Sequence, residues 1–275
     1  MLKCGITGAT GVLGKKIIKS LPFKFYQFKK DITKSNEVRD WVKKYKFDLI
    51  IHLAAITPVI EVKKNYKKAL KVNVIGTKNL VNSLLKKKDK PKWFFYASTS
   101  HVYKLNKKLK FTKENEVIKP QNFYGKTKLI AEKYLIKKLK NKETSLCIGR
   151  IFSFTDKNQK KPFVIPSLIN KIIKNKSKEV KILNLNHYRD FLTTTIISKI
   201  IYQLSKKKSK GIFNIASGKP IHLEKVALLI CKKYKKKFTK SKYNSPTYLI
   251  ANIKKISRVC TLPKMKFKNN LKYLY

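Results

Sequence analysis

The chain has 275 residues, 43% of them hydrophobic, with 15 Phe, 14 Tyr and a formal net charge of +53. This length and composition exclude a disordered basic tail and are typical of a globular protein of one domain, or of one domain with a small appended lobe. Lysines occur throughout the chain and do not gather on one element. We therefore interpret the charge as a general surface property and expect no specific nucleic-acid site.

Two further classes of protein are disfavoured by the sequence. No apolar run reaches the ~18 residues that a membrane span requires, and Met1-Leu2-Lys3 leads directly into a strand pattern and a glycine turn. We therefore expect a cytoplasmic protein that does not associate with a membrane. The four cysteines are far apart, without a CxxC pair or a His at ligand spacing, which predicts buried free thiols at Cys4 and Cys147, a reducing compartment and no metal site.

Short apolar runs alternate with helical patterns through the first half of the chain. The strand patterns lie at residues 2–7, 23–28, 48–53, 93–98 and 145–152, and the helical patterns at 14–20, 36–45, 66–86 and 124–140. Apolar strands that alternate with helices indicate a parallel sheet covered on both faces. The sequence therefore predicts an α/β fold with a doubly wound parallel sheet, the Rossmann arrangement.

Beyond residue 155 the pattern loosens. Helical patterns lie at 163–175, 194–205 and 223–233, and a strand pattern lies at 211–216. We expect residues 1–155 to form the Rossmann domain. Residues 156–275 are expected to form mainly a small C-terminal lobe, with some segments returning to the sheet.

Glycines recur directly after the first predicted strand, in the segment 8–14 (GATGVLG), which opens the first helix. Glycine allows the backbone to turn tightly and to approach a pyrophosphate, which then lies at the positive N-terminus of the helix. The spacing is GxxGxxG and differs from the GxGxxG of the common dinucleotide fingerprint. A plain strand-to-helix connection is the alternative, but the position at the first junction favours a cofactor site.

Two groups of polar side chains carry possible chemistry. Tyr124 and Lys128 are four residues apart in a helical pattern, so the phenol and the ammonium lie on one face. A phenol, with a pKa near ~10, is a poor base at neutral pH, and a nearby cation lowers that pKa. Ser98-Thr99-Ser100 end the strand at 93–98, at the edge where doubly wound sheets bind ligands. Chance recurrence of Tyr-x3-Lys and an ordinary Ser/Thr turn are the alternatives.

These motifs, in this order, resemble the extended short-chain dehydrogenase/reductase family, the NAD-dependent epimerase/dehydratase family of sugar-nucleotide enzymes. The gap of 25 positions from Thr99 to Tyr124 is similar to the family's spacing between its strand hydroxyl and its Tyr-Lys pair. Further matches run along most of the chain, at residues 52–55 (HLAA), 73–77 (NVIGT), 119–124 (KPQNFY), 187–192 (HYRDFL) and 211–218 (GIFNIASG).

The resemblance implies a role for each motif. Tyr124 would be the general acid/base that exchanges a proton with a sugar hydroxyl or ketone, while a nicotinamide carries the hydride. Lys128 would bind the nicotinamide ribose and lower the pKa of Tyr124, and Asn73 would be structural, in a helix kink. Substrate would contact Thr99, Ser100 and Arg189, and a surface salt bridge is the alternative for Arg189. The implied cofactor-binding residues are Gly8, Thr10, Gly11, Val12, Leu13, Gly14, Asp31, Ile32, Leu53, Ala54, Ala55, Tyr124 and Lys128.

The chain also departs from the family pattern. Ser100-His101 stand where the dehydratase subgroup carries Asp-Glu, which argues against a 4,6-dehydratase. Ser153 replaces a frequent Asn, which weakens the expectation of sugar-nucleotide phosphate contacts. Lys29 and Lys30 follow the second strand in place of an acid that would bind the ribose of NAD. NADP is therefore slightly favoured as the cofactor.

The implied function is that of an NAD(P)-dependent epimerase or 4-keto reductase acting on a nucleotide sugar. A homodimer formed through the helical patterns 66–86 and 124–140 is expected by the same analogy. Two alternatives stay open. One is a reductase of a non-nucleotide carbonyl compound. It is allowed by the departure at Ser153 and by Thr193-Thr194-Thr195, which stand where the family's segment corresponding to 187–192 usually continues to an Asp pair. The other is a non-catalytic NAD(P)-sensing relative, which would not need an acid/base Tyr.

Overall fold

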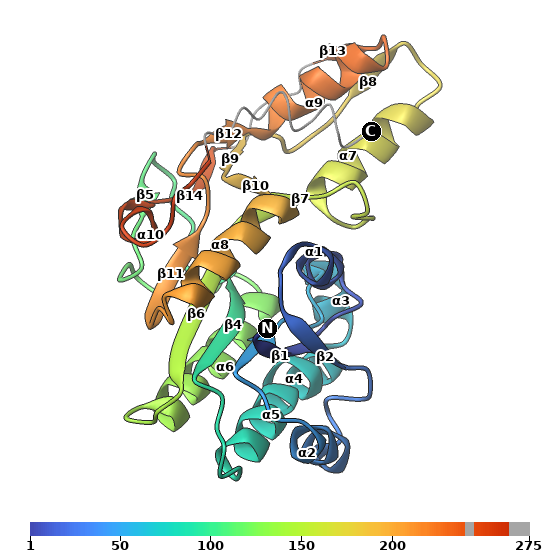
Figure 1. Cartoon of the computed structure of the whole chain (residues 1–275). Helices are drawn as coiled ribbons and strands as arrows, with labels where there is room; N and C mark the ends of the chain where they lie inside the picture. Colours follow the sequence, from blue (N-terminus) through green and yellow to red (C-terminus); the bar gives the residue numbers. More distant parts are fainter. Residues whose placement is uncertain (240–244, 264–275) are drawn as a thin grey trace.

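A six-stranded parallel sheet dominates the computed structural model, which describes residues 1–239 and 245–263 (Figure 1). The strand order is β11-β6-β4-β3-β1-β2. It reverses between β1 and β3, and ligands of doubly wound sheets bind at the carboxyl ends of strands at such a switch point. The predicted α/β fold is confirmed. The strands are β1 (Lys3–Thr7), β2 (Lys24–Phe28), β3 (Leu49–His52), β4 (Trp93–Thr99), β6 (Ser145–Ile151) and β11 (Gly211–Ile215).

Helices cover both faces of this sheet (Figure 1). Successive side chains of a strand point to opposite faces, so Trp93 and Phe95 of β4 pack in the apolar cluster of α1 and α8, while Phe94 and Tyr96 pack in that of α2, α5 and α6. Within the described chain no helix is long and apolar enough to cross a membrane. These helices are α1 (Val12–Ser20), α2 (Ser35–Lys44), α5 (Gly76–Leu85), α6 (Phe123–Leu139) and α8 (Thr194–Lys206).

The segment predicted as a single helix at 66–86 is divided. It consists of α4 (Tyr66–Leu70), the π-helical segment η1 (Lys71–Ile75) and α5, and it follows an unpredicted short helix, α3 (Val59–Lys64). The wider turn contains Asn73, whose Oδ1 accepts from Ile56 N at 2.8 Å and whose Nδ2 donates to Ile56 O at 3.1 Å. The structural role predicted for Asn73 agrees with these bonds.

The chain beyond β6 builds a lobe of helices and short strands beside the main sheet (Figure 1). The predicted helices at 163–175, 194–205 and 223–233 and the strand at 211–216 are present, and β11 is the edge strand of the main sheet. The short strands were not predicted, because most of them span only two or three residues, too few to show an alternating pattern. The further elements are β5 (Phe111–Thr112), β7 (Ser153–Thr155), α7 (Val164–Lys174), β8 (Glu179–Lys181), β9 (His187–Arg189), β10 (Phe191–Thr193), β12 (Ile221–His222), α9 (Leu223–Lys233), β13 (Lys237–Thr239), β14 (Thr247–Ala251) and α10 (Lys254–Ser257).

Asp190, between β9 and β10, ties the lobe to the main sheet. Its buried carboxylate accepts from Ser217 N at 2.7 Å, from Ser217 Oγ at 2.6 Å and from Gly218 N at 2.8 Å, in the turn after β11. Ala251 N of β14 donates to it at 3.3 Å. The segments 187–192 and 211–218, which resemble family motifs, are therefore joined through one side chain.

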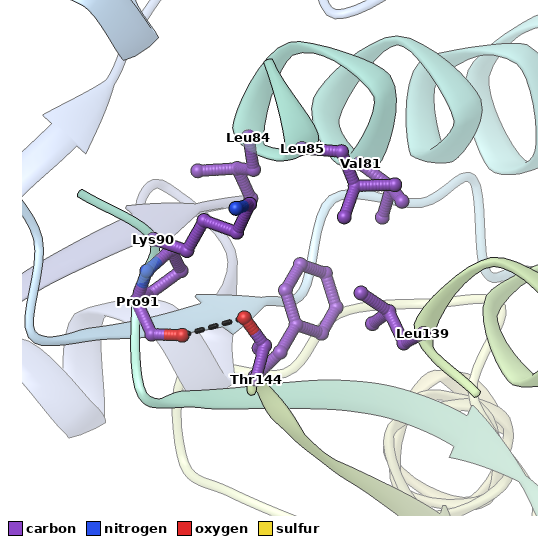
Figure 2. Close-up of a pocket in the computed structure, with 8 residues that line it drawn as sticks. Val81, Leu84, Leu85, Lys90, Pro91, Leu139 and Thr144 are labelled. Atoms are coloured by element: carbon purple, nitrogen blue, oxygen red, sulfur yellow. Dashed lines mark hydrogen bonds between the residues drawn. The ribbon is translucent and has the colours of Figure 1, made fainter. Parts of the chain in front are cut away.

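A small apolar cavity lies at the amino ends of β4 and β6 (Figure 2). Thr144 Oγ1 donates to Pro91 O at 2.7 Å across its mouth. The predicted site residues lie at the carboxyl ends of the strands, so this cavity belongs to the hydrophobic core and not to the candidate site. Its lining residues are Val81, Leu84, Leu85, Lys90, Pro91, Phe94, Leu139 and Thr144.

Candidate active site

The glycine turn after β1 meets the loop after β3 at the switch point of the sheet. Gly8 has φ +71°, and a Cβ there would lie 2.7 Å from Ala54 N. Leu53 N donates to Thr7 O at 3.1 Å, which extends the β1–β3 pairing into this loop. The structure thus brings Gly8 together with Leu53 and Ala54, from two separate motifs, and Ala55 follows them in the same loop.

The N-terminus of α1 opens beside this turn. A Cβ on Gly14 would lie 2.3 Å from Gly8 O, so glycine is needed for α1 to pack on the turn. Gly11 precedes α1, no described side chain caps the helix, and its first turn contains no acidic residue. The first N–H groups of a helix lack intrahelical partners and carry positive charge. Thr10 and Gly11 are exposed and Leu13 is buried in the core, so the exposed turn fits a pyrophosphate, with Gly14 and Leu13 beneath it.

The residues after β2 form a tight turn. The Asp31 carboxylate accepts from Thr33 N at 2.9 Å and from Thr33 Oγ1 at 2.8 Å, and these bonds lower its pKa. Ile32 is buried against α5, where a Cβ on Gly76 would lie 2.6 Å from its Cγ2. Lys29 and Lys30 are exposed directly before this turn.

His52, in the family-like segment 52–55, is a buried link between elements. Its Nδ1 lies 2.6 Å from Thr7 Oγ1 of β1, and its Nε2 lies 2.8 Å from Thr77 Oγ1 of α5. Burial, with a smaller effect of the Lys128 charge, lowers its pKa to about 3. His52 is therefore neutral, and it fixes the carboxyl ends of β1 and β3 to α5.

Thr99 and Tyr124 converge at the carboxyl end of β4. Asn122 caps α6 by accepting from Gly125 N at 2.9 Å, and a Cβ on Gly125 would lie 2.2 Å from His101 O. Glycine therefore allows the start of α6 to pack on the 3-10 turn η2 (Ser100–Val102), directly after β4. Burial raises the pKa of Tyr124 to about 12, against a lowering effect of its side-chain hydrogen bond with Thr99.

The Thr99 hydroxyl is oriented by the main chain. Its Oγ1 accepts from His101 N at 3.2 Å. A hydroxyl has one proton to donate and two lone pairs to accept with. Thr99 can therefore donate its proton to an oxygen in the site while its position stays fixed.

Lys128 lies one helical turn after Tyr124 and is fully enclosed. Its Nζ is 4.1 Å from the centroid of the Tyr96 ring. Burial lowers the pKa of Lys128 to about 7, and the charge of Glu132 raises it. The ammonium is therefore near its midpoint of protonation at neutral pH. The expected effect of Lys128 on the pKa of Tyr124 stays a prediction.

Replacing Lys128 with Met should stabilise the fold at low pH. Because the pKa falls from 10.5 to about 7 on folding, the folded protein binds fewer protons than the unfolded chain between these values, and wild-type stability rises with pH through this window. We expect Lys128→Met to be more stable than wild type by ~1 kcal/mol or more below pH ~7, since it removes a buried charge. The advantage should shrink towards pH ~10.

Thermal unfolding of both proteins over this pH range checks the prediction. Lys126→Met, on the exposed face of the same helix, is the control and should differ little from wild type at every pH. A Lys128→Met variant that is less stable than wild type at pH ~6 would mean that the contacts with Tyr96 and Glu132 outweigh the burial of the charge.

A buried ion pair behind the site was missed by the sequence analysis. Arg150 Nη2 of β6 lies 2.7 Å from Glu132 Oε2, with side chains 4% and 1% exposed. Ser98 Oγ donates to the other carboxylate oxygen, and Arg150 Nη1 donates to Tyr103 OH at 3.0 Å. The sequence shows that Glu132 lies four residues after Lys128, on the same face of α6, but this spacing does not show that the face is buried.

Besides Thr99 of β4, the residues predicted to contact substrate are Ser100 of η2 and Arg189 of β9. Arg189 of β9 donates to Tyr188 O at 2.9 Å, to Thr247 O at 3.1 Å and to Thr247 Oγ1 at 3.1 Å. Burial lowers its pKa to about 10, so it is a cation at neutral pH, and its charge lowers the pKa of His101. Ser100 is buried in η2. Of this pair, Arg189 is thus the more accessible to a ligand.

Comparison with known proteins places the chain in a family. The family model for GDP-mannose 4,6 dehydratase matches residues 6–261. The chain is 29% identical to GDP-6-deoxy-D-talose 4-dehydrogenase of Aggregatibacter actinomycetemcomitans, over 84% of this chain and 79% of the relative. It is 28% identical to GDP-6-deoxy-D-mannose reductase of Pseudomonas aeruginosa, over 62% of this chain and 58% of the relative.

The solved structures agree with this in fold. The structure of RMD from Pseudomonas aeruginosa complexed with NADPH superposes with a TM-score of 0.89 at 20% identity, covering 100% of this chain and 97% of that one. MoeE5 in complex with UDP-glucose and NAD superposes with a TM-score of 0.84 at 19% identity, over 99% and 97% of the two chains. The chain thus belongs to the GDP-mannose 4,6-dehydratase family, within the extended short-chain dehydrogenases/reductases.

Proposed function

We propose that the protein is an NAD(P)-dependent enzyme that reduces or epimerises a nucleotide sugar. The observation that carries this proposal is the convergence of the Thr99 and Tyr124 hydroxyls at the carboxyl end of β4, with Lys128 one turn along α6. A phenol and a hydroxyl so placed can both bond to one oxygen of a substrate alcohol or ketone. The relatives named above act, by their names, on GDP-linked deoxysugars, which supports the same substrate class.

Tyr124, Thr99 and Lys128 have different roles in the proposed proton transfer. Tyr124 gives its proton to the carbonyl oxygen during reduction and takes it back in the reverse direction. Thr99 donates a hydrogen bond to the same oxygen and holds it in reach of the phenol. Lys128 binds the ribose, and its charge, when present, favours the phenolate. The bound nicotinamide supplies or accepts the hydride.

Reduction or epimerisation is favoured over dehydration by the residues beside Thr99. Ser100 is buried in η2, and burial lowers the pKa of His101 to about 4. Neither side chain supplies the carboxyl groups that the dehydratase subgroup carries at these positions. Arg189, a cation in the lobe of residues 156–275, is proposed to bind the diphosphate of the substrate.

NADP is proposed as the slightly preferred cofactor. Lys29 and Lys30 are exposed at the carboxyl end of β2, the strand next to β1, where a cation would attract a 2′-phosphate. The Asp31 carboxylate is engaged by Thr33 in the following turn. We place the adenine beside Asp31 and Ile32.

A homodimer through the helices after β3 and through α6 is also proposed. Exposed apolar side chains are found on these helices at Ile60, Ile75, Phe123, Ile130 and Ile136. Their burial in a second copy would remove apolar surface from water. Sedimentation of the purified protein tests this directly, and Ile130→Asp should shift a dimer towards the monomer.

Replacing Gly11 with Ala should weaken cofactor binding without unfolding the protein. Among the described residues, a Cβ there would meet Gly8 O alone, at 3.3 Å, and the φ of Gly11, −68°, suits alanine. The methyl group would instead obstruct the pyrophosphate at the start of α1. We expect NADPH affinity to fall ~10-fold, or ~1.4 kcal/mol, by calorimetry, with little change in unfolding temperature.

Gly14→Ala provides the contrast for this test. Its Cβ would lie 2.3 Å from Gly8 O, so this variant should lose folding stability as well as affinity. If Gly11→Ala bound NADPH as tightly as the wild type, the pyrophosphate would not bind at this turn.

A thermal-shift screen with NAD, NADP and UDP-, GDP- and dTDP-sugars tests the function. A ligand at ~100 times its dissociation constant adds ~2.7 kcal/mol of stability. Stabilisation by a dinucleotide and by one nucleotide sugar is expected. Stabilisation by the dinucleotide alone would favour the reductase of a non-nucleotide carbonyl compound, and no shift with either dinucleotide would contradict the cofactor site.

A further inference from the structure

His101 lies beside the reacting group on the turn η2. Its ring meets the Tyr124 ring edge-on, with centroids 5.8 Å apart and an interplanar angle of 70°. The charge of Arg189, on β9 of the lobe, is near enough to lower its pKa. His101 is therefore close to both the proposed acid/base and the proposed diphosphate-binding cation, yet the proton transfer described above does not use it.

Hydrogen bonds fix the tautomer of His101. Asn122 Oδ1 accepts from Gly125 N at 2.9 Å as the N-cap of α6, so its amide nitrogen is the atom 2.8 Å from His101 Nδ1. An amide nitrogen can only donate. Nδ1 of His101 must then accept with its lone pair, and the ring proton is on Nε2. A second proton on Nδ1 would face an N–H group, so the ring stays neutral.

The Nε2–H group is available to a ligand. Within residues 1–239 and 245–263 the only hydrogen bond of the His101 side chain is that of Nδ1. Nε2 is not fully buried, so it keeps surface that a ligand atom can contact. A fixed, neutral donor next to Tyr124 suits an uncharged hydroxyl or carbonyl oxygen of a sugar.

We propose that His101 donates a hydrogen bond from Nε2 to the sugar of the nucleotide sugar and so positions its reacting carbon against Tyr124. This inference rests on the proposed function and assigns a specificity role that the acid/base residues do not fill. No proton leaves His101 in the reaction. An aromatic ring without nitrogens would keep the contact with Tyr124 but lose the donor.

Nitrogen-15 NMR of the imidazoles tests the tautomer without knowledge of the substrate. The chain has 4 His, and His101→Gln identifies the signal. We expect Nδ1 to be unprotonated and Nε2 protonated from about pH 5 to 9. Of the titratable groups near the ring, Arg189 repels a positive imidazole, and Tyr124 is neutral in this range. Titration near the ordinary ~6.5, or a proton on Nδ1, would overturn the proposal.

Steady-state kinetics tests the contact. The enzyme is assayed with NADPH and with GDP-mannose, UDP-glucose, dTDP-glucose and their 4-keto derivatives, and the variants are compared on whichever substrate turns over. We expect kcat/KM for the nucleotide sugar to fall ~3–10-fold in His101→Phe, the value of one neutral hydrogen bond, with NADPH affinity unchanged. His101→Gln, whose amide can donate, should recover at least half of the loss. Equal kcat/KM in wild type and His101→Phe would overturn this inference alone, whereas a wild type that neither binds nor turns over any of these sugars would overturn the proposed function with it.

Discussion

Tyr124→Phe is expected to reduce turnover more than ~100-fold while leaving cofactor binding intact. The variant removes only the hydroxyl that would exchange the proton, and acid–base groups of this kind contribute about 10²–10⁴-fold to rate. The ring would still fill its place against His101, 5.8 Å away between centroids, so α6 should keep its position. Steady-state kinetics with the nucleotide sugar and calorimetry with NADPH measure the two effects separately.

Tyr134→Phe is the matched control for this variant. Tyr134 lies on the same helix, and its hydroxyl donates to Asn82 Oδ1 at 2.6 Å on the exposed side. We expect its kcat to stay within about twofold of wild type. Turnover by Tyr124→Phe at the rate of Tyr134→Phe would exclude Tyr124 as the acid/base.

Glu132→Gln is expected to destabilise the fold by about 3–5 kcal/mol. The substitution leaves the Arg150 guanidinium charged inside the protein, where the paired side chains are 4% and 1% exposed. Removing one partner of a buried ion pair has a cost of this size because the other charge stays desolvated. Denaturant unfolding of wild type and variant gives the difference in free energy.

Two further variants separate the ion pair from other effects. Glu179→Gln makes the same chemical change in an exposed pair with Lys237, 2.8 Å apart, and should leave the stability close to that of the wild type, because solvent screens the pair. The double variant Glu132→Leu with Arg150→Met replaces both charges with apolar groups and should recover most of the loss. A Glu132→Gln variant as stable as Glu179→Gln would show that the buried guanidinium finds other compensation.

The parts of the site that the sequence predicted are local. The glycine turn follows a strand and opens a helix, and Tyr124 and Lys128 share one helical face, so each motif is visible within a few residues. Thr99 could be placed with them because parallel strands end at one edge of a sheet. The resemblance to the family then supplied the order of the motifs.

The parts that were missed depend on contacts between distant residues. A kink at Asn73 was expected from the resemblance, but its partner, the main chain of Ile56, and the π-helical form of the turn were not. Glu132 meets Arg150, 18 positions along the chain, and only the folded sheet brings them together. A polar side chain in an amphipathic helical pattern is normally expected to be exposed, so the burial of Glu132 could not be inferred from its spacing.

The tautomer of His101 is a further property that the sequence alone does not reveal. It follows from the N-cap role of Asn122, whose oxygen is used by Gly125 N and whose nitrogen therefore faces the ring. In the sequence, this position is visible only as a departure from the dehydratase pattern. In the structure, the side chain at this position, His101, is a hydrogen-bond donor beside the proposed acid/base.

The most direct test of the central claim is hydride transfer itself, followed by the absorbance of NADPH with 4-keto derivatives of GDP-, UDP- and dTDP-sugars. The wild type is expected to oxidise NADPH with at least one of them, and Tyr124→Phe is expected to bind both ligands without oxidation. The account would be contradicted by a protein that binds NADPH and a nucleotide sugar saturably but catalyses neither reaction. The two reactions are hydride transfer to a 4-keto sugar and epimerisation of a nucleotide sugar in the presence of NAD.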